Sequence, residues 1–138
     1  MGRPHSAFSL ARYFRALADP TRLRLLNLMA GREICVCYFV AILRISQPKI
    51  SRHLAYLRKA GIVAARPEGK WMHYHLAIPA DTTAARVLRE TLNHLKEKPE
   101  MMRDVARLAS ACCAPRKTEL LQSAPQPARV SDATFAAN

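Results

Sequence analysis

Residues 46–61 read SQPKISRHLAYLRKAG, and this stretch decides the fold. Ser46 can cap a helix by accepting a hydrogen bond from a free backbone N–H, Pro48 suits the first turn, and Gly61 suits a left-handed stop. At helical spacing, one face carries the apolar residues Ile50, Leu54 and Leu57. The opposite face carries Lys49, Arg52, Tyr56 and Lys59. The stretch therefore predicts a helix that buries one side and presents basic side chains on the other.

The residues before this helix predict shorter helices. Apolar spacing predicts one over about 7–18, and Asp19-Pro20 then supplies a cap and a first-turn proline for a second that ends at Gly31. Residues 34–43 are apolar nearly all round, so a helix there would be buried. Two short apolar helices followed by a basic one form the helix-turn-helix pattern, in which the second helix enters the major groove of DNA.

The residues after Gly61 predict a hairpin and further helices. Residues 62–66 and 71–77 are rich in strand-forming residues and flank the turn sequence PEGK at 67–70, where a winged helix-turn-helix has its wing. A helix that begins near Asp81 carries a narrow apolar seam of the kind that pairs helices, at Ala85, Leu88, Leu92 and Leu95. A shorter helix follows over about 100–111. The predicted fold class is α+β, mainly α with a β-hairpin.

The length of 138 residues supports one compact domain with appendages. We assign residues 1–98 to the DNA-binding and dimerisation domain and 99–113 to a C-terminal helix that ends in the vicinal pair Cys112-Cys113. Residues 114–138 are expected to form a disordered tail, because prolines, Ala and Ser dominate a stretch with little apolar periodicity.

The chain carries 22 Lys and Arg against 10 Asp and Glu, a net charge of +12. Residues 44–70 hold seven basic residues and one acid, a net charge of +6 on the predicted helix and hairpin. Such charge attracts a polyanion, and its concentration on these two elements favours DNA over a membrane surface. No apolar run approaches the ~18 residues that span a bilayer, and the N-terminus lacks the apolar core of a signal peptide. We therefore expect a cytoplasmic location and no membrane partner.

The chain contains four strings of note, LADPTR at 17–22, EICVC at 33–37, SQPKISRHL at 46–54 and GKWMHY at 69–74. Together they closely resemble the ArsR/SmtB metalloregulatory repressors, above all the arsenical-resistance operon repressors. The resemblance covers about residues 8–97. It implies a homodimeric winged helix-turn-helix repressor that pairs through its first and post-wing helices. It also implies release from a near-palindromic operator in double-stranded DNA when an inducer binds.

Cys35 and Cys37 are the first candidate ligands. In a regular helix, residues two apart point about 200° away from each other, so binding must act at a helix end or distort the helix. The resemblance implies that both thiols bind As(III) or Sb(III), soft ions suited to thiolates. Whether the inducer is inorganic or methylated stays open.

The repressors that this chain resembles add a third cysteine three residues after the second, and that position here is Val40. The chain instead offers Cys112 and Cys113, whose adjacency strains a mutual disulfide but suits chelation of a metalloid. We expect one or both to complete the Cys35/Cys37 site or to form a site of their own, within one subunit or across the dimer.

A zinc site is disfavoured. Zinc-sensing relatives place four ligands on the post-wing helix, and the matching positions here are Asp81, Thr83, His94 and Glu97. Thr83 is a poor zinc ligand, so we interpret the set as a remnant. His73 and His75 alternate onto one face of a hairpin strand, where we expect DNA-facing or surface positions.

The DNA-binding residues fall into two groups. Those expected to reach base edges are Gln47, Ser51, Arg52 and His53. Those expected to contact phosphates are Lys49, Lys59, Arg66 and Lys70. A thiol redox sensor or a zinc-responsive repressor of the same fold stays an alternative. A thiol enzyme such as an arsenate reductase is disfavoured, because the spacing is Cys-x-Cys and no phosphate-binding loop precedes it.

Overall fold

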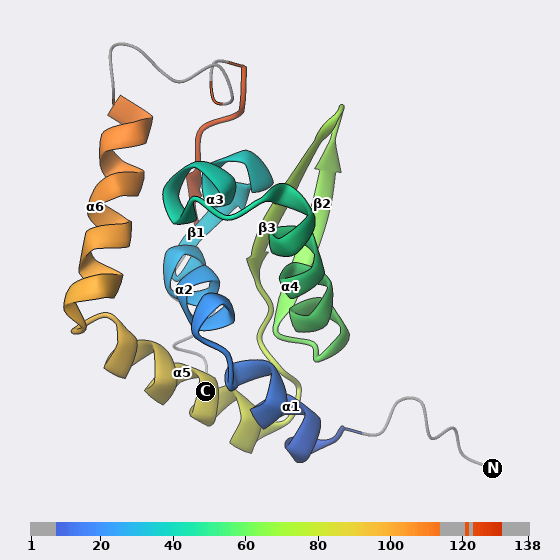
Figure 1. Ribbon diagram of the computed structural model, residues 1–138. Helices are drawn as coiled ribbons and strands as arrows, with labels where there is room; N and C mark the ends of the chain where they lie inside the picture. The colour runs from blue at the N-terminus through green and yellow to red at the C-terminus, as the bar shows by residue number, and fades with distance from the viewer. Residues whose placement is uncertain (1–7, 114–120, 122, 131–138) are drawn as a thin grey trace.

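The computed structural model describes residues 8–113, 121 and 123–130. Its elements are α1 (Leu10–Leu17), α2 (Pro20–Met29), β1 (Arg32–Cys35), α3 (Val36–Leu43), α4 (Gln47–Lys59), β2 (Val63–Glu68), β3 (Trp71–Leu76), α5 (Thr82–Leu95), α6 (Pro99–Cys113) and β4 (Ala128–Arg129). In Figure 1, α4 stands beside the hairpin β2–β3, whereas α6 runs along the opposite side of the molecule against α2 and α3. Across the described residues, no helix is long and apolar enough to cross a bilayer. The predicted winged helix-turn-helix fold is confirmed.

Local capping chemistry sets the helix starts. Asp19 accepts a hydrogen bond from the backbone N–H of Arg22 at 3.0 Å, and Pro20 opens α2, as predicted. Ser46 holds the N-cap position of α4, but its side chain accepts no capping hydrogen bond, so that prediction is wrong. Pro48 has no N–H to donate, so the backbone N–H of Lys49 is the remaining target for a cap, and Ser46 does not bind it.

Residues 34–43 are not one helix. The chain forms strand β1 up to Cys35 and turns into α3 only at Val36, so the prediction of a helix from Ile34 is wrong. Gly31, in a left-handed conformation with φ 75°, follows α2 and redirects the chain into β1. A short apolar run cannot be assigned to a strand or a buried helix from periodicity alone.

The strands form one antiparallel sheet in the order β2-β3-β1-β4. The predicted hairpin is confirmed, with Val63 opposite Leu76 at its base and Glu68 opposite Trp71 at its tip. Pro67 and Glu68 belong to β2, and only Gly69 and Lys70 form the turn. On the other edge of β3, Ile34 lies opposite Tyr74 and Cys35 lies opposite His73. The wing is therefore joined to β1 by a backbone ladder.

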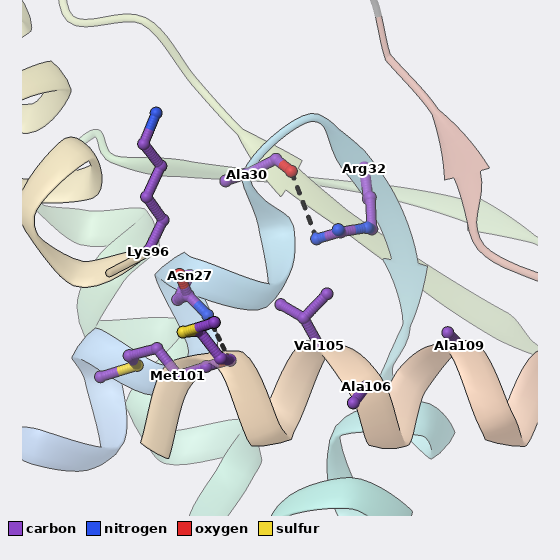
Figure 2. Close-up of a pocket in the computed structure, with 9 residues that line it drawn as sticks. Asn27, Ala30, Arg32, Lys96, Met101, Val105, Ala106 and Ala109 are labelled. Atoms are coloured by element: carbon purple, nitrogen blue, oxygen red, sulfur yellow. Dashed lines mark hydrogen bonds between the residues drawn. The ribbon is translucent and has the colours of Figure 1, made fainter. Parts of the chain in front are cut away.

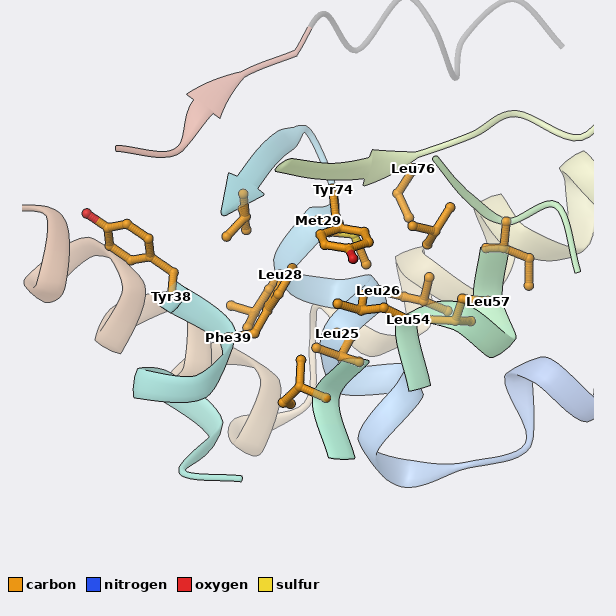
Figure 3. Packing of buried hydrophobic residues seen from close by; sticks show 14 of the residues in the cluster. Leu25, Leu26, Leu28, Met29, Tyr38, Phe39, Leu54, Leu57, Tyr74 and Leu76 are labelled. Atoms are coloured by element: carbon orange, nitrogen blue, oxygen red, sulfur yellow. The ribbon is translucent and has the colours of Figure 1, made fainter. Parts of the chain in front are cut away.

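The core surrounds α2, whose Leu25, Leu26, Leu28 and Met29 are buried. Figure 3 shows these side chains with Phe39 on one side, Tyr74 above them and Leu54 and Leu57 of α4 on the other side. The apolar stripe of α4, predicted at Ile50, Leu54 and Leu57, is fully buried. Burial of each such side chain is worth about 1.5–3 kcal/mol, so this packing holds α4 in place.

The apolar seam of α5 packs inside the chain. Ala85, Leu88 and Leu95 are buried, and the Tyr13 hydroxyl of α1 donates to the Ala84 carbonyl at 3.0 Å. The exposed apolar side chains near the N-terminus are instead Phe8, Leu10 and Phe14. The seam thus packs helices together within the chain at Ala85, Leu88 and Leu95, whereas Leu92 is only half-buried. Pairing of α5 across a dimer stays a prediction.

Helix α6 is fixed to α2 by a buried ion pair. The Arg24 guanidinium donates to both carboxylate oxygens of Asp104, at 2.8 and 2.9 Å, and the Asp104 side chain is fully buried. The Asn27 side-chain amide also donates to the Met101 carbonyl at 3.2 Å. Beside these contacts lies a hollow of about 500 Å³, walled largely by apolar side chains of α6, with Arg32 and Lys96 at its edges (Figure 2).

The expected disordered tail is described only in part. Residues 114–120, 122 and 131–138 lie outside the described residues, and there the expectation stays a prediction. Within the described part, Leu121 and Ala124 join the core cluster, and β4 pairs with β1 through Arg32 and Arg129.

We predict that Asp104→Asn destabilises the chain, because it leaves a largely buried guanidinium without its counter-charge. Removing one partner of a buried pair costs about 3–5 kcal/mol, and the 19% exposure of the Arg24 side chain favours the lower end. Urea denaturation measures the loss. Glu90→Gln makes the same chemical change on an exposed carboxylate of α5 and should stay within about 0.5 kcal/mol. Equal losses in the two variants would contradict the structural role of the ion pair.

Candidate DNA interface and thiol site

The outer face of α4 is basic and exposed. Burial of Ile50, Leu54 and Leu57 turns the opposite side of the helix to the surface. The exposed residues predicted to meet DNA there are Gln47, Lys49, Ser51, Arg52 and Lys59. His53, the remaining candidate on this helix, is half-buried. The structure therefore gathers most of the predicted α4 residues on one accessible surface.

Arg22 at the start of α2 supports this face, and the sequence reasoning missed it. Its guanidinium lies 4.2 Å from the centre of the Tyr56 ring, and its Nη1 lies 3.3 Å from Nδ1 of His53. It also donates to the carbonyls of Arg15 and Ala16 at 2.9 and 2.8 Å. The arginine thus ties α1 and α2 to α4 and holds His53 inward. The string LADPTR contains this arginine, but nothing local reveals its long-range contacts.

A hollow of about 430 Å³ opens between α2 and α4. Its wall comprises Thr21, Arg22, Ile45, Lys49, Arg52, His53 and Tyr56. Because cations and hydrogen-bond donors line a concave surface beside a helix start, the hollow suits a phosphate group.

The wing supplies two more residues predicted to contact phosphates, of which one is exposed and the other is bound by a carboxylate. Lys70 lies exposed at the tip, with its Nζ 5.1 Å from the centre of the Trp71 ring. Arg66 is engaged by Glu33 on β1, with Nη2 2.6 Å from Oε1 and Nε 3.2 Å from Oε2. The hydrogen bond from Arg66 lowers the pKa of Glu33, so the carboxylate is charged at neutral pH. Glu33 therefore offsets the charge that the sequence assigned to phosphate binding.

His73 is not a surface residue. It is buried, and its Nε2 lies 2.8 Å from Oε1 of Glu68. His75 is half-buried, and its Nδ1 lies 3.3 Å from Oε2 of Glu33. The expectation of a DNA-facing or surface position is wrong for His73, because the sheet and its carboxylates enclose the ring.

Cys35 and Cys37 lie at a junction between a strand and a helix. Cys35 ends β1 and occupies the N-cap position of α3 with extended backbone angles, φ −70° and ψ 144°, whereas Cys37 lies in the first helical turn. Both are buried, and the Cys35 thiol lies close enough to Cys37 to affect its protonation. Of the two arrangements that the helical geometry left open, the structure shows the helix end. No helix needs to unwind for the two thiols to meet.

Burial controls the protonation of this pair. Removal from water, followed by the nearby Cys35 thiol, raises the pKa of Cys37 to about 11. The Cys37 thiol is therefore protonated at neutral pH. Any ligand that bonds to this sulfur must displace a proton.

The C-terminal thiols are placed differently. Cys112 on α6 is half-buried and packs against the core. Cys113 ends α6, and its side chain lies outside the described part of the structure. Among the described residues, no group of three or more His, Cys, Asp or Glu side chains could hold a metal ion. Cys112 is thus not joined to Cys35 and Cys37 in a ligand set of three.

The remnant zinc positions also lie apart within the chain. The Asp81 carboxylate caps α5 by accepting from the N–H of Ala84 at 2.9 Å. His94 lies in the last turn of the same helix, and Glu97 follows it. Fourteen helical residues extend for about 20 Å, so one chain cannot bring both ends to one ion.

Comparisons with known proteins agree with this geometry. The family described as "Bacterial regulatory protein, arsR family" matches residues 19–65. The arsenical resistance operon repressor of Escherichia coli (strain K12) is 43% identical over 96 residues, which cover 68% of this chain and 82% of that protein.

Solved structures share the fold. The homodimeric winged helix-turn-helix domain Mb0332 from Mycobacterium bovis is 29% identical with a TM-score of 0.53, and the match covers 65% of this chain and 81% of that one. The AntR antimony-specific transcriptional repressor is 30% identical with a TM-score of 0.50, and the match covers 64% and 78%.

We predict that titration of Cys37 weakens the fold at alkaline pH. Because the folded pKa is raised from 9.0 to about 11, the protonated thiol favours the folded state. This contribution is complete below pH 9 and is lost as the pH rises through 11. The difference in unfolding free energy between the parent and Cys37→Ala should therefore narrow between pH 9 and 11. A difference that stays constant over this range would show that the pKa of Cys37 is not raised by folding.

Proposed function

The chain belongs to the arsR family of bacterial regulatory proteins, and on that premise we propose that it is an arsenite- or antimonite-responsive repressor. It binds a near-palindromic operator in double-stranded DNA as a homodimer. It dissociates when As(III) or Sb(III), inorganic or methylated, bonds to cysteine sulfurs. Its relatives are transcriptional regulators and not enzymes, and we place its action in the cytoplasm.

The exposed basic face of α4 beside the wing carries the DNA-binding proposal. In this fold the second helix of the motif enters the major groove, where Gln and Arg side chains can read adenine and guanine edges. We assign base contacts to Gln47, Ser51 and Arg52, and to His53 where the ring turns outward from its contact with Arg22. We assign phosphate contacts to Lys49, Lys59, Arg66 and Lys70, with Arg66 using the N–H groups that its bridge to Glu33 leaves free.

Exposed apolar residues support the homodimer. Phe8, Leu10 and Phe14 at and before α1 are 41–48% exposed, although large apolar side chains are usually buried. A second copy that covers this patch would remove it from water, and the related Mycobacterium bovis domain is homodimeric. Two-fold symmetry then places two copies of α4 about one helical turn apart along the DNA.

The inducer proposal rests on Cys35 and Cys37, with Cys112 and Cys113 as further ligands. The two buried thiols meet at the start of α3, and α3 packs directly against α4. Among the relatives, one is named for arsenical resistance and another for antimony. A bond between a metalloid and both sulfurs would shift the start of α3 and, through it, α4. Typical allosteric couplings of ~1–3 kcal/mol would lower operator occupancy substantially.

The first test concerns the DNA interface. A labelled duplex that carries the palindrome selected by this chain from a random library serves as the operator. We predict that Arg52→Ala weakens operator binding by about 1–3 kcal/mol at fixed salt and relaxes one base preference, because a bidentate base contact is lost. Arg103→Ala removes another exposed arginine, from α6, and should change neither the operator affinity nor the base preference. Unchanged affinity in Arg52→Ala would refute its assignment.

The second test concerns the thiols. We predict that arsenite releases the operator from the parent chain and that Cys35→Ser and Cys37→Ser respond only at far higher concentrations, because each loses one sulfur ligand. Operator release from Cys112→Ser and Cys113→Ser shows whether a C-terminal sulfur takes part. Methylarsenite needs only two sulfurs, so release by it should be unaffected by loss of a third.

Excess mild monothiol separates metalloid binding from oxidation, since only oxidative release disappears in its presence. If all four serine variants respond like the parent, the thiol site is refuted.

A further inference from the structure

Strand β1 belongs to both the thiol site and the wing. Cys35 ends β1 and lies opposite His73 on β3, and His73 lies opposite Arg66 on β2. Cys35, His73 and Arg66 thus lie side by side across three neighbouring strands, and this row joins a proposed inducer ligand, Cys35, to a proposed DNA contact, Arg66. Backbone hydrogen bonds join these strands, so β1 cannot shift without moving the middle of the wing.

Glu33, two residues before Cys35, adds a side-chain link across the same sheet. Its carboxylate receives both hydrogen bonds from Arg66, at 2.6 and 3.2 Å, and lies 3.3 Å from Nδ1 of His75. The side chain of Glu33 is 15% exposed, against 49% for Arg66. Because β1 and β2 are separated by β3, this bridge reaches over one strand to hold an arginine on the next. A single carboxylate on β1 thus contacts both strands of the wing.

We propose that Glu33 is the positioning residue that couples occupancy of the Cys35/Cys37 site to the placement of Arg66 on DNA. This inference rests on the proposed function and identifies how the signal reaches the wing. In the free protein, the two parallel N–H···O bonds fix both the position and the plane of the guanidinium. Chelation of both sulfurs draws Cys35 toward Cys37 and carries Glu33 with it, because the two residues share one short strand.

The consequence for Arg66 follows from the geometry of the bridge. A bidentate pair tolerates little change in orientation, so a moved carboxylate either pulls the guanidinium from its phosphate or releases it to other positions. Both outcomes weaken the DNA complex. The packing of α3 on α4 also transmits the effect of metalloid binding. Loss of the Glu33–Arg66 bridge therefore reduces the release of DNA by a metalloid without abolishing it, and leaves metalloid binding itself intact.

The test compares two variants with the same change of charge. Glu33→Gln breaks the bridge from β1, whereas Glu68→Gln removes a carboxylate of the wing itself, which lies 3.7 Å from Arg66. Fluorescence anisotropy with the selected duplex gives operator affinity with and without saturating arsenite, and ultraviolet absorption of arsenic–sulfur bonds gives metalloid binding separately.

We expect the parent to lose operator affinity by about 5- to 150-fold when arsenite binds. The ratio of operator affinity without arsenite to that with arsenite should be roughly 2- to 30-fold smaller in Glu33→Gln, and the affinity for arsenite should be retained. Glu68→Gln should keep the ratio of the parent, although both variants gain some operator affinity from the lost negative charge. Equal ratios in Glu33→Gln and Glu68→Gln would overturn the proposal.

A second variant shows whether the effect of Glu33→Gln comes from the lost bridge or from a folding defect. Arg66→Gln breaks the same bridge from the wing, and it should lower the ratio equally while also weakening operator binding in both states. In the double variant Glu33→Gln/Arg66→Gln the two losses should not add, because they remove one interaction. Additive losses would also overturn the proposal. A parent chain that fails to bind arsenite or to release the duplex would instead refute the proposed function.

Discussion

Antiparallel pairing of β1 with β3 is the interaction on which both candidate sites depend. It fixes Cys35 opposite His73 and so ends the strand at the residue that also holds the N-cap position of α3. The same pairing joins the thiol segment to the wing through the backbone. If residues 34–43 formed one helix, the two sulfurs would point about 200° apart and the wing would be an isolated hairpin. A four-residue strand therefore decides both where the thiols meet and what they can move.

Features set by neighbouring residues could be predicted from the sequence, whereas contacts between residues far apart in the chain could not. The capped start of α2, the buried stripe of α4 and the hairpin are encoded within a few residues, and the structure confirms them. β1 was missed because its partner β3 lies about 40 residues further along the chain and four residues carry no reliable period. The Arg24–Asp104 pair joins residues 80 apart in sequence, and no local pattern indicates it.

The positive charge of the wing is overestimated from the sequence for a similar reason. The stretch 44–70 holds seven basic residues and one acid, but Glu33 lies outside that stretch and beside Arg66 in space. The effective positive charge of the wing is thus smaller than its sequence indicates, and Lys70 at the tip is its freely presented cation. The basic face of α4 has no such acidic neighbour from β1, so the recognition helix retains the larger share of attraction for a polyanion.

The high pKa of Cys37 bears on which ligand the thiol site would accept. A divalent metal ion requires thiolates, so it would have to expel two protons and place charged groups in a buried site. Arsenous acid is a neutral molecule with hydroxyl groups on arsenic. When a thiol displaces one hydroxyl, an As–S bond forms, the S–H and As–O bonds break, and the proton leaves with the hydroxyl as water. No net charge enters the buried site, and no thiolate has to persist in it. Burial that raises the pKa of Cys37 therefore penalises a hard or strongly charged ion much more than a trivalent metalloid.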